Sequence, residues 1–247
     1  MARRPRWKIP AAALSLIVVA ALGASGPGAA SADGRGPDDD SRVSSSLEAA
    51  SAAIPTVGRP LVTDAARSDP SLQPSGGKAV STATATSGCN GCSGTATTLQ
   101  TVRVVGGGAA VADNVAAAWS SCAGCSSTAV SVQIITGPQA SSVVVNNRSL
   151  AINVTCSGCT TTAVALQFVI IGGSQRELSA ETKSLIQQIE QELGLKLSTT
   201  RAAHPGDSWH DEASKDADDA ASRAKAAIAT DTHAASVAAR VEVDAGD

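Results

Sequence analysis

Hydrophobic side chains alternate with small or polar ones along three stretches in the middle of the chain. In one stretch, Val164, Leu166 and Phe168 are separated by an alanine and a glutamine. Residues 129–134 repeat this pattern, and the stretch around Leu99 has threonines at two of the large apolar positions. A period of two is typical of a β-strand, because successive side chains point to opposite faces. Each stretch therefore predicts a strand with one apolar face and one small or polar face.

A pair of cysteines, separated by two residues, precedes each of these strands. The pairs are Cys89 and Cys92, Cys122 and Cys125, and Cys156 and Cys159. The first cysteine of a pair recurs after 33 and then after 34 residues. A glutamine follows each second cysteine by eight residues, at Gln100, Gln133 and Gln167. Three aligned copies indicate an internal repeat, and a further β-rich stretch precedes each pair, at residues 79–87, 109–121 and 142–155.

The centre of each cysteine pair predicts a turn. Asn90-Gly91 between strand residues is a strong signal for a two-residue hairpin, because glycine tolerates positive φ. We therefore expect a mainly β fold of three hairpins tipped by the cysteine pairs, which form an antiparallel sheet, barrel or sandwich. The alternative is a β-solenoid with one repeat per coil and the glutamines of the polar face stacked in a ladder. Both arrangements align equivalent residues, so the sequence leaves both open.

The first of four segments, residues 1–32, is predicted to be a secretory signal peptide. Four basic residues precede an uncharged apolar run, and small residues follow up to Ala30-Ser31-Ala32. The apolar run is shorter than the roughly 20 residues that a membrane-spanning helix needs. We therefore expect a protein that is secreted, either extracellular or associated with the cell wall, and that has no membrane association after cleavage.

The other three segments differ in composition. Residues 33–78 are rich in Gly, Pro, Ser and Asp without apolar periodicity, which predicts a disordered linker. Residues 79–173 hold all six cysteines and only three charged residues, and form the β-repeat domain. Residues 174–247 carry 14 acidic residues against 8 Lys and Arg, and are predicted to form an acidic helical tail. Its first helix is expected to stop at Gly194, and its second, 208–240, to lie loosely on the surface because it is mostly alanine.

The six cysteines are expected to form structural disulfides. A secreted chain meets an oxidising environment, and an even number of cysteines allows complete pairing. Of the 15 connectivities, pairing within each Cys-x-x-Cys is favoured. Two further interpretations stay open: a zinc site built from two pairs, and thiol–disulfide catalysis of the kind that needs a helix N-terminus beside the cysteines.

The run from Cys156 to Ile170 resembles a repeat found in uncharacterised secreted proteins of high-GC bacteria, in which a Cys-x-x-Cys is followed by a Thr/Ala/Gln strand. The similarity covers roughly residues 79–173. It implies an extracytoplasmic compartment and a repeat architecture, and no activity. Similar repeats also accompany some membrane zinc-peptidase-like proteins. Because this chain lacks a His-Glu-x-x-His motif, that activity does not carry over.

Composition argues against several function classes. Signal cleavage removes four basic residues and no acids, so the net charge falls from −3 to −7, which disfavours nucleic acid as a partner. Aromatic residues make up 2% of the chain, and only Trp119, Phe168 and Trp209 remain after cleavage. An aromatic-lined pocket or base-stacking platform is therefore not expected. The one His/Asp cluster, His204, Asp207, His210 and Asp211, is interpreted as a solvated loop and helix start rather than a metal site.

Together these features predict a non-enzymatic structural or interaction protein without a cofactor. Its expected partner is an unidentified protein or the cell envelope, and self-association is one form of that interaction. The alternative is an extracytoplasmic thiol–disulfide or metal-handling protein that uses its cysteine pairs.

We predict that the mature protein begins at Asp33, directly after the Ala-x-Ala cleavage signal. N-terminal sequencing of protein recovered from the culture medium checks this. A recovered chain that retains Met1 would contradict it.

Overall fold

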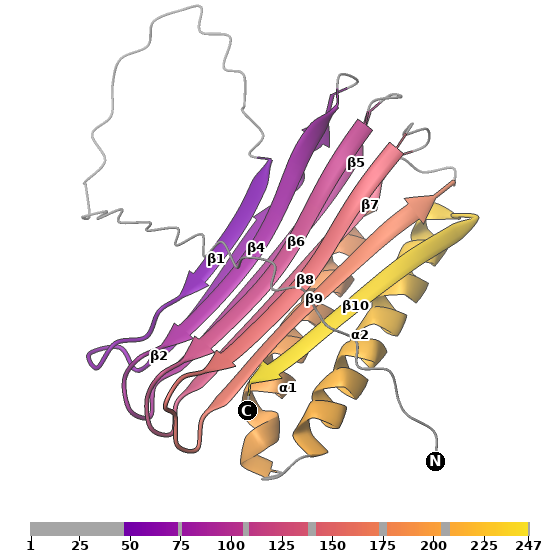
Figure 1. Ribbon diagram of the computed structural model, residues 1–247. Coiled ribbons are helices and arrows are strands. Elements are labelled where there is room, and N and C mark those ends of the chain that lie inside the picture. The colour runs from indigo at the N-terminus through magenta and orange to yellow at the C-terminus, as the bar shows by residue number, and fades with distance from the viewer. Residues whose placement is uncertain are drawn as a thin grey trace, which may run out of the picture. The chain divides into compact units, whose positions relative to one another are not determined.

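The computed structural model describes residues 47–73, 76–105, 109–137, 142–172, 177–203 and 208–246. Within these residues, successive coils of the chain form a β-solenoid, and two helices and a last strand follow it (Figure 1). The mainly β class and the solenoid alternative are therefore confirmed. The predicted signal peptide lies outside the described residues.

Each coil contributes one strand to each of two sheets. The four-stranded sheet has the order β1-β4-β6-β8, with β1 at Glu48–Ala53, β4 at Gly77–Ser87, β6 at Ala109–Ser120 and β8 at Ser142–Asn153. The six-stranded sheet contains β2 at Leu61–Ser68, β5 at Ser93–Val104, β7 at Ser126–Thr136 and β9 at Thr160–Ile171. Strand β10, Ser236–Gly246, joins it antiparallel to β9, and the short β3, Ser71–Leu72, pairs with β5.

The predicted antiparallel hairpins are wrong, because the strands on either side of a cysteine pair belong to different sheets. Each instead pairs in parallel with its equivalent in the next coil, as Ala96 does with Ala129. The Cys92 N–H donates to the Cys89 carbonyl at 3.0 Å, and in this turn only Gly91 has a positive φ, of 70°. Two-residue hairpins of type I′ need positive φ at both central residues, whereas a type II turn needs it only at the second.

Small side chains fill the space between the two sheets. Ala83 and Ala116 of the four-stranded sheet meet Ala96, Ala129 and Ala163 of the other, and all five are fully buried. The opposite, large apolar faces of β7 and β9 are buried as well, beneath the helices. Burial on both faces is typical of parallel sheets, and it explains why one face of each repeat is apolar and the other small.

The prediction of a disordered linker over residues 33–78 is wrong for those of its residues that the structure describes. Residues 33–46 lie outside the described residues, but β1, β2 and β3 follow, and β1 and β2 form a shorter coil that has no cysteine. Its register continues the repeat, since Leu61 aligns with Ser93 and Ser68 with Gln100. The solenoid interior accepts alanine and serine, so this coil needs no large apolar residues and its composition resembles that of a linker.

Two helices cover the six-stranded sheet. Helix α1 is Ala180–Ala203 and α2 is Ser208–Thr232, and both contribute to the core over β7 and β9. Helix α1 runs through Gly194 instead of ending there. A Cβ at Gly194 would lie 3.3 Å from Thr97 Cγ2, so the glycine allows the helix to approach β5 closely.

The expected loose second helix is also corrected. Ala213, Ala217 and Ile228 of α2 are completely buried, because small side chains let the helix pack close to its neighbours. The helix stops at Thr232, and β10 takes up the rest of the predicted helical stretch. No helix in the described part of the chain is both long and apolar enough to cross a membrane.

An aspartate protects each end of the four-stranded sheet. At the first strand, the Ala52 N–H donates to the Asp64 carboxylate at 2.7 Å. At the last strand, the Ala151 N–H donates to the Asp244 carboxylate at 2.9 Å. An unpaired edge N–H is a site for strand addition by another chain, so these carboxylates blunt both edges.

We predict that Glu190 of α1 makes stability depend on pH. Its carboxyl is buried near Thr97 and Arg67, and burial raises its pKa to about 7, although the Arg67 charge and the Thr97 hydroxyl act in the opposite direction. An unfolded glutamate titrates near 4.5. Between these values the folded chain keeps a proton that the unfolded chain has lost, so stability falls as the pH rises.

The Glu190→Gln variant should lose this dependence and be more stable than the wild type above pH 7, by up to about 3 kcal/mol. Urea unfolding at pH 5 and pH 8 measures it. Glu192→Gln, at an exposed position of the same helix, is the control. Equal shifts for the two variants at both pH values would contradict the prediction.

Candidate functional site

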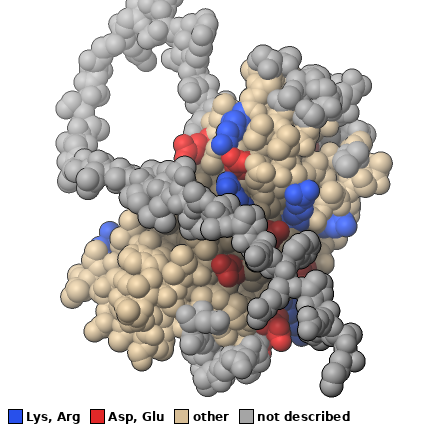
Figure 2. Space-filling view, viewed as in Figure 1, with Lys and Arg blue, Asp and Glu red and all other residues tan. Residues whose placement is uncertain are grey.

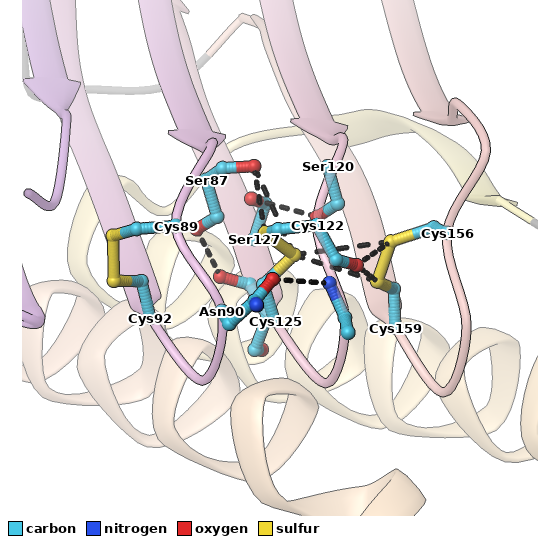
Figure 3. Close-up of a disulfide and its surroundings, with 12 residues drawn as sticks. Ser87, Cys89, Asn90, Cys92, Ser120, Cys122, Cys125, Ser127, Cys156 and Cys159 are labelled. Atoms are coloured by element: carbon cyan, nitrogen blue, oxygen red, sulfur yellow. Dashed lines mark hydrogen bonds between the residues drawn. A yellow bond between two sulfur atoms is a disulfide. The ribbon is translucent and has the colours of Figure 1, made fainter. Parts of the chain in front are cut away.

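The three cysteine pairs are stacked along one edge of the solenoid, where the chain passes from one sheet to the other (Figure 3). The structure joins Cys89 to Cys92, Cys122 to Cys125 and Cys156 to Cys159, which is the local pairing that the sequence favours. The pairs lie between strands and not at a helix N-terminus, where a thioredoxin-like pair would lie.

Main-chain hydrogen bonds hold the stacked turns together independently of the sulfur atoms. The Gly91 N–H donates to the Ala123 carbonyl at 2.9 Å, and the Gly124 N–H donates to the Ser157 carbonyl at 2.8 Å. The Asn90 side chain adds a bond, because its Oδ1 accepts the Ala123 N–H at 3.0 Å. Each turn is thus fixed to the turn of the next coil.

The sulfur atoms are not evenly spaced along this edge. Cys125 Sγ lies 3.4 Å from Cys159 Sγ and 3.8 Å from Cys156 Sγ. Cys92 Sγ instead points to the first coil, with the Thr56 carbonyl oxygen at 3.9 Å. Two of the three pairs therefore form a sulfur cluster, which we define as Cys122, Cys125, Cys156 and Cys159.

The three predicted glutamines lie side by side between the sheets. Gln167 Nε2 donates to Gln133 Oε1, and Gln133 Nε2 donates to Gln100 Oε1, each at 2.7 Å. The ladder ends in the first coil, where Gln100 Nε2 donates to Ser68 Oγ at 3.2 Å. The side-chain amides also donate to main-chain carbonyls of the four-stranded sheet, as Gln133 does to Asp113. The glutamines are buried, so the polar face of these strands is the interior of the solenoid.

Sequence analysis did not find a second set of stacked amides, the asparagines Asn114 and Asn147. Asn114 Nδ2 donates to Asn147 Oδ1 at 2.8 Å and to the Ser131 and Leu166 carbonyls, each at 3.0 Å. Asn114 Oδ1 accepts the Ser131 hydroxyl at 2.7 Å. The two asparagines are 33 residues apart, the spacing of the repeat, and that spacing was the signal that could have found them.

The outer face of the four-stranded sheet, which points away from the solenoid interior, exposes large apolar side chains. Trp119 is 42% exposed, Val144 and Leu150 are each 52% exposed, and Ile152 is 41% exposed. Trp119 and Ile152 are direct neighbours in the register of β6 and β8. In Figure 2, uncharged residues cover much of the described surface in that view, and several Lys, Arg, Asp and Glu side chains lie among them.

One ion pair lies on this outer face. Lys78 Nζ is 2.6 Å from Asp113 Oδ2, and Asn146 Nδ2 donates to Asp113 Oδ1 at 2.5 Å. Burial acts to raise the pKa of Asp113, but the hydrogen bonds from Lys78 and Asn146 outweigh it and hold the pKa below its ordinary value. The lowered pKa keeps the Asp113 carboxylate charged, and the carboxylate holds the side chains of Lys78 and Asn146.

The predicted His/Asp cluster is described only in part. His204 and Asp207 lie outside the described residues, while the His210 ring lies against Trp209 with the ring centroids 5.1 Å apart. A set of metal-ligand atoms that the described structure does bring together is the Sγ of Cys125, Cys156 and Cys159, all within 4.8 Å of one another.

The geometry defines the chain as a β-solenoid with a helical C-terminal part. Comparisons with protein-family models, with curated proteins and with solved structures found no match.

We predict that the glutamine ladder stabilises the fold. Gln133→Ala removes the donor to Gln100 and the acceptor of Gln167 in a buried site, so it should cost roughly 1–3 kcal/mol. Gln191→Ala, at an exposed position of α1, should stay within about 0.5 kcal/mol of the wild type. Denaturant unfolding measures both, and an unchanged midpoint for Gln133→Ala would show that the ladder contributes nothing.

Proposed function

We propose that the chain is a secreted, non-enzymatic structural or interaction protein of the cell surface or extracellular space. Its binding surface is the outer face of the four-stranded sheet. The observation that carries the proposal is the group of exposed apolar residues at one end of that face, where Trp119 is the register neighbour of Ile152 and Leu150 lies two residues before Ile152 on the same side of β8. Val144 is exposed on the same face, but Asn146 and Arg148 lie between it and Leu150. Apolar groups of this kind mark interaction sites when they are contiguous.

The support beneath this face favours binding without rearrangement. On the interior side of the same strands, Asn114 and Asn147 are hydrogen-bonded to each other and to the six-stranded sheet. Ser81 of β4 likewise bonds Ser131 of β7 through their hydroxyls at 2.9 Å. A rigid sheet loses little conformational entropy when a partner docks, so more of the contact energy contributes to affinity.

Two features of the chain support a location outside the cytoplasm: its N-terminal pattern and its paired cysteines. The basic and apolar N-terminal pattern of residues 1–32 supports export. Cysteines paired as disulfides along one edge suit an oxidising environment and would be unstable in a reducing one. Both observations support a role outside the cytoplasm.

A second candidate function is thiol–disulfide or metal handling outside the cytoplasm. The observation that favours it is the short distance between sulfur atoms of neighbouring turns, 3.4 Å from Cys125 to Cys159. Disulfides that serve only to hold their own turns do not need this contact.

The surface role is tested by binding to the envelope fraction of the organism that carries the gene, and by sedimentation of the purified chain alone for self-association. The double variant Leu150→Thr/Ile152→Thr places β-branched threonine, which favours strands, at both positions and removes two of the exposed large apolar side chains. We expect at least about tenfold weaker binding, as for central residues of an interface.

Leu195→Gln on α1 is the matched control, because Leu195 is an exposed apolar residue away from this sheet. The control should bind like the wild type. Equal binding by the double variant, an equal loss in the control, or a wild type that neither binds envelope nor self-associates would each contradict the proposal.

A further inference from the structure

We propose that the sulfur cluster, once reduced, binds one zinc ion between two adjacent turns through four thiolates: Cys122, Cys125, Cys156 and Cys159. The first pair, Cys89 and Cys92, is not part of this site. The inference does not depend on the proposed surface role; it rests on the second candidate function, metal handling, and names the ion and its ligands.

Two of the distances between sulfur atoms of neighbouring turns suit a tetrahedral zinc site. Zinc–sulfur bonds of about 2.3 Å place the sulfur atoms of a regular tetrahedron about 3.8 Å apart. Cys125 Sγ lies 3.8 Å from Cys156 Sγ and 3.4 Å from Cys159 Sγ. The fourth sulfur comes from Cys122, which belongs to the same turn as Cys125 and is joined to it in the oxidised form, where its Sγ lies 3.2 Å from the Ser87 carbonyl oxygen of the preceding coil. Once both disulfides are reduced, the Cys122 side chain has to rotate from Ser87 toward the next turn to complete the site.

The two turns present their cysteines in the spacing that zinc sites use. Each has two residues between its cysteines, the commonest ligand spacing of structural zinc sites. Gly124 and Gly158 occupy the same position in the two turns, with φ of 62° and 68°, so the main chain of both turns has a similar conformation at this point. In Figure 3, the sulfur atoms of these two pairs face one another, whereas the Cys89–Cys92 disulfide lies apart from them.

The turns do not need their disulfides to stay in place. The Thr160 N–H donates to the Cys125 carbonyl at 2.9 Å, and the Ser126 N–H donates to the Cys92 carbonyl at 2.9 Å. Together with the bond from Gly124 to Ser157, these link each turn to its neighbour. A disulfide that closes such a short loop also removes little entropy from the unfolded chain. We therefore expect the solenoid to persist after reduction.

The environment of the cluster favours a bound ion over solvated thiols. Cys122, Cys125 and Cys159 are buried, and Cys156 is half-buried, so it gives access to the site. Burial keeps competing water away from the ion, and thiolate is a ligand type that selects zinc over the harder calcium and magnesium.

The chemistry balances with a reductant and zinc as the only co-reactants. Each disulfide accepts two electrons and two protons, supplied by a dithiol or, in the experiment, by a phosphine with water, and becomes two thiols. Zinc then displaces the four thiol protons and forms four Zn–S bonds. A small-molecule disulfide reverses the sequence by thiol–disulfide exchange: two molecules of it accept four electrons, and four protons from water, and become four thiols, while two S–S bonds form in the chain and the ion is released.

The test uses the full chain, reduced with a phosphine under anaerobic conditions and titrated with Co²⁺ and then Zn²⁺. We expect one Co²⁺ per chain, with the absorption of a tetrahedral cobalt thiolate, and its complete displacement by one Zn²⁺. The far-UV circular dichroism of the reduced chain should match that of the oxidised chain. The variant Cys125→Ser/Cys159→Ser should lose the cobalt absorption, and Cys156→Ser should weaken and shift it.

The matched control is Cys89→Ser/Cys92→Ser, which removes a pair of the same spacing from the neighbouring turn. It should bind one Co²⁺ like the wild type. Absence of tetrahedral cobalt in the reduced wild type, loss of binding in the control, full binding by Cys125→Ser/Cys159→Ser, or loss of the β-sheet signal on reduction would each overturn the proposal.

Discussion

Parallel pairing in register is the constraint on which the rest of this structure depends, because it places each residue beside its own equivalent in the next coil. Gln133 lies between Gln100 and Gln167, and Asn114 lies beside Asn147. Identical charges in such positions would repel one another. A side-chain amide both donates and accepts, so each amide within a column of identical amides satisfies its neighbours, and only Gln167 Oε1, at the end of the described ladder, is left without a hydrogen-bond partner. This requirement accounts for an interior of amides, hydroxyls and alanines, and for the scarcity of charge in residues 79–173.

The same stacking determines where the helices lie. On the outer side of the six-stranded sheet, Thr101 aligns with Ile134 and then Phe168, so the side chains become larger toward the last coil. The large residues form the core with α1 and α2, while the smaller ones leave room for Gly194 of α1 to approach β5. The first cysteine-bearing copy thus has threonines where the other copies have large apolar residues, because Gly194 of α1 packs closely against this copy.

Much of the architecture could be predicted from the sequence, and the failures have physical causes. The strands around each cysteine pair follow from their period of two, but hairpins and coils both align equivalent residues. Gly91 alone could not decide between them, because both arrangements need a positive φ at that point. The coil of β1 and β2 was missed because it has no cysteine, and an interior that accepts small residues gave it no apolar pattern. The packing of α2 was missed because buried alanines such as Ala217 carry no periodic signal of large residues.

The carboxylates of Asp64 and Asp244 have a consequence for how such a protein can change in length. They close the first and last strands of the four-stranded sheet, and the coils between them are interchangeable in register. A duplicated coil inserted between the two ends would pair on both sides and create no new open edge. The solenoid can therefore grow in steps of one strand spacing, about 4.8 Å, adding one row to its outer face each time. The number of coils between the two end strands therefore sets the width of the outer face.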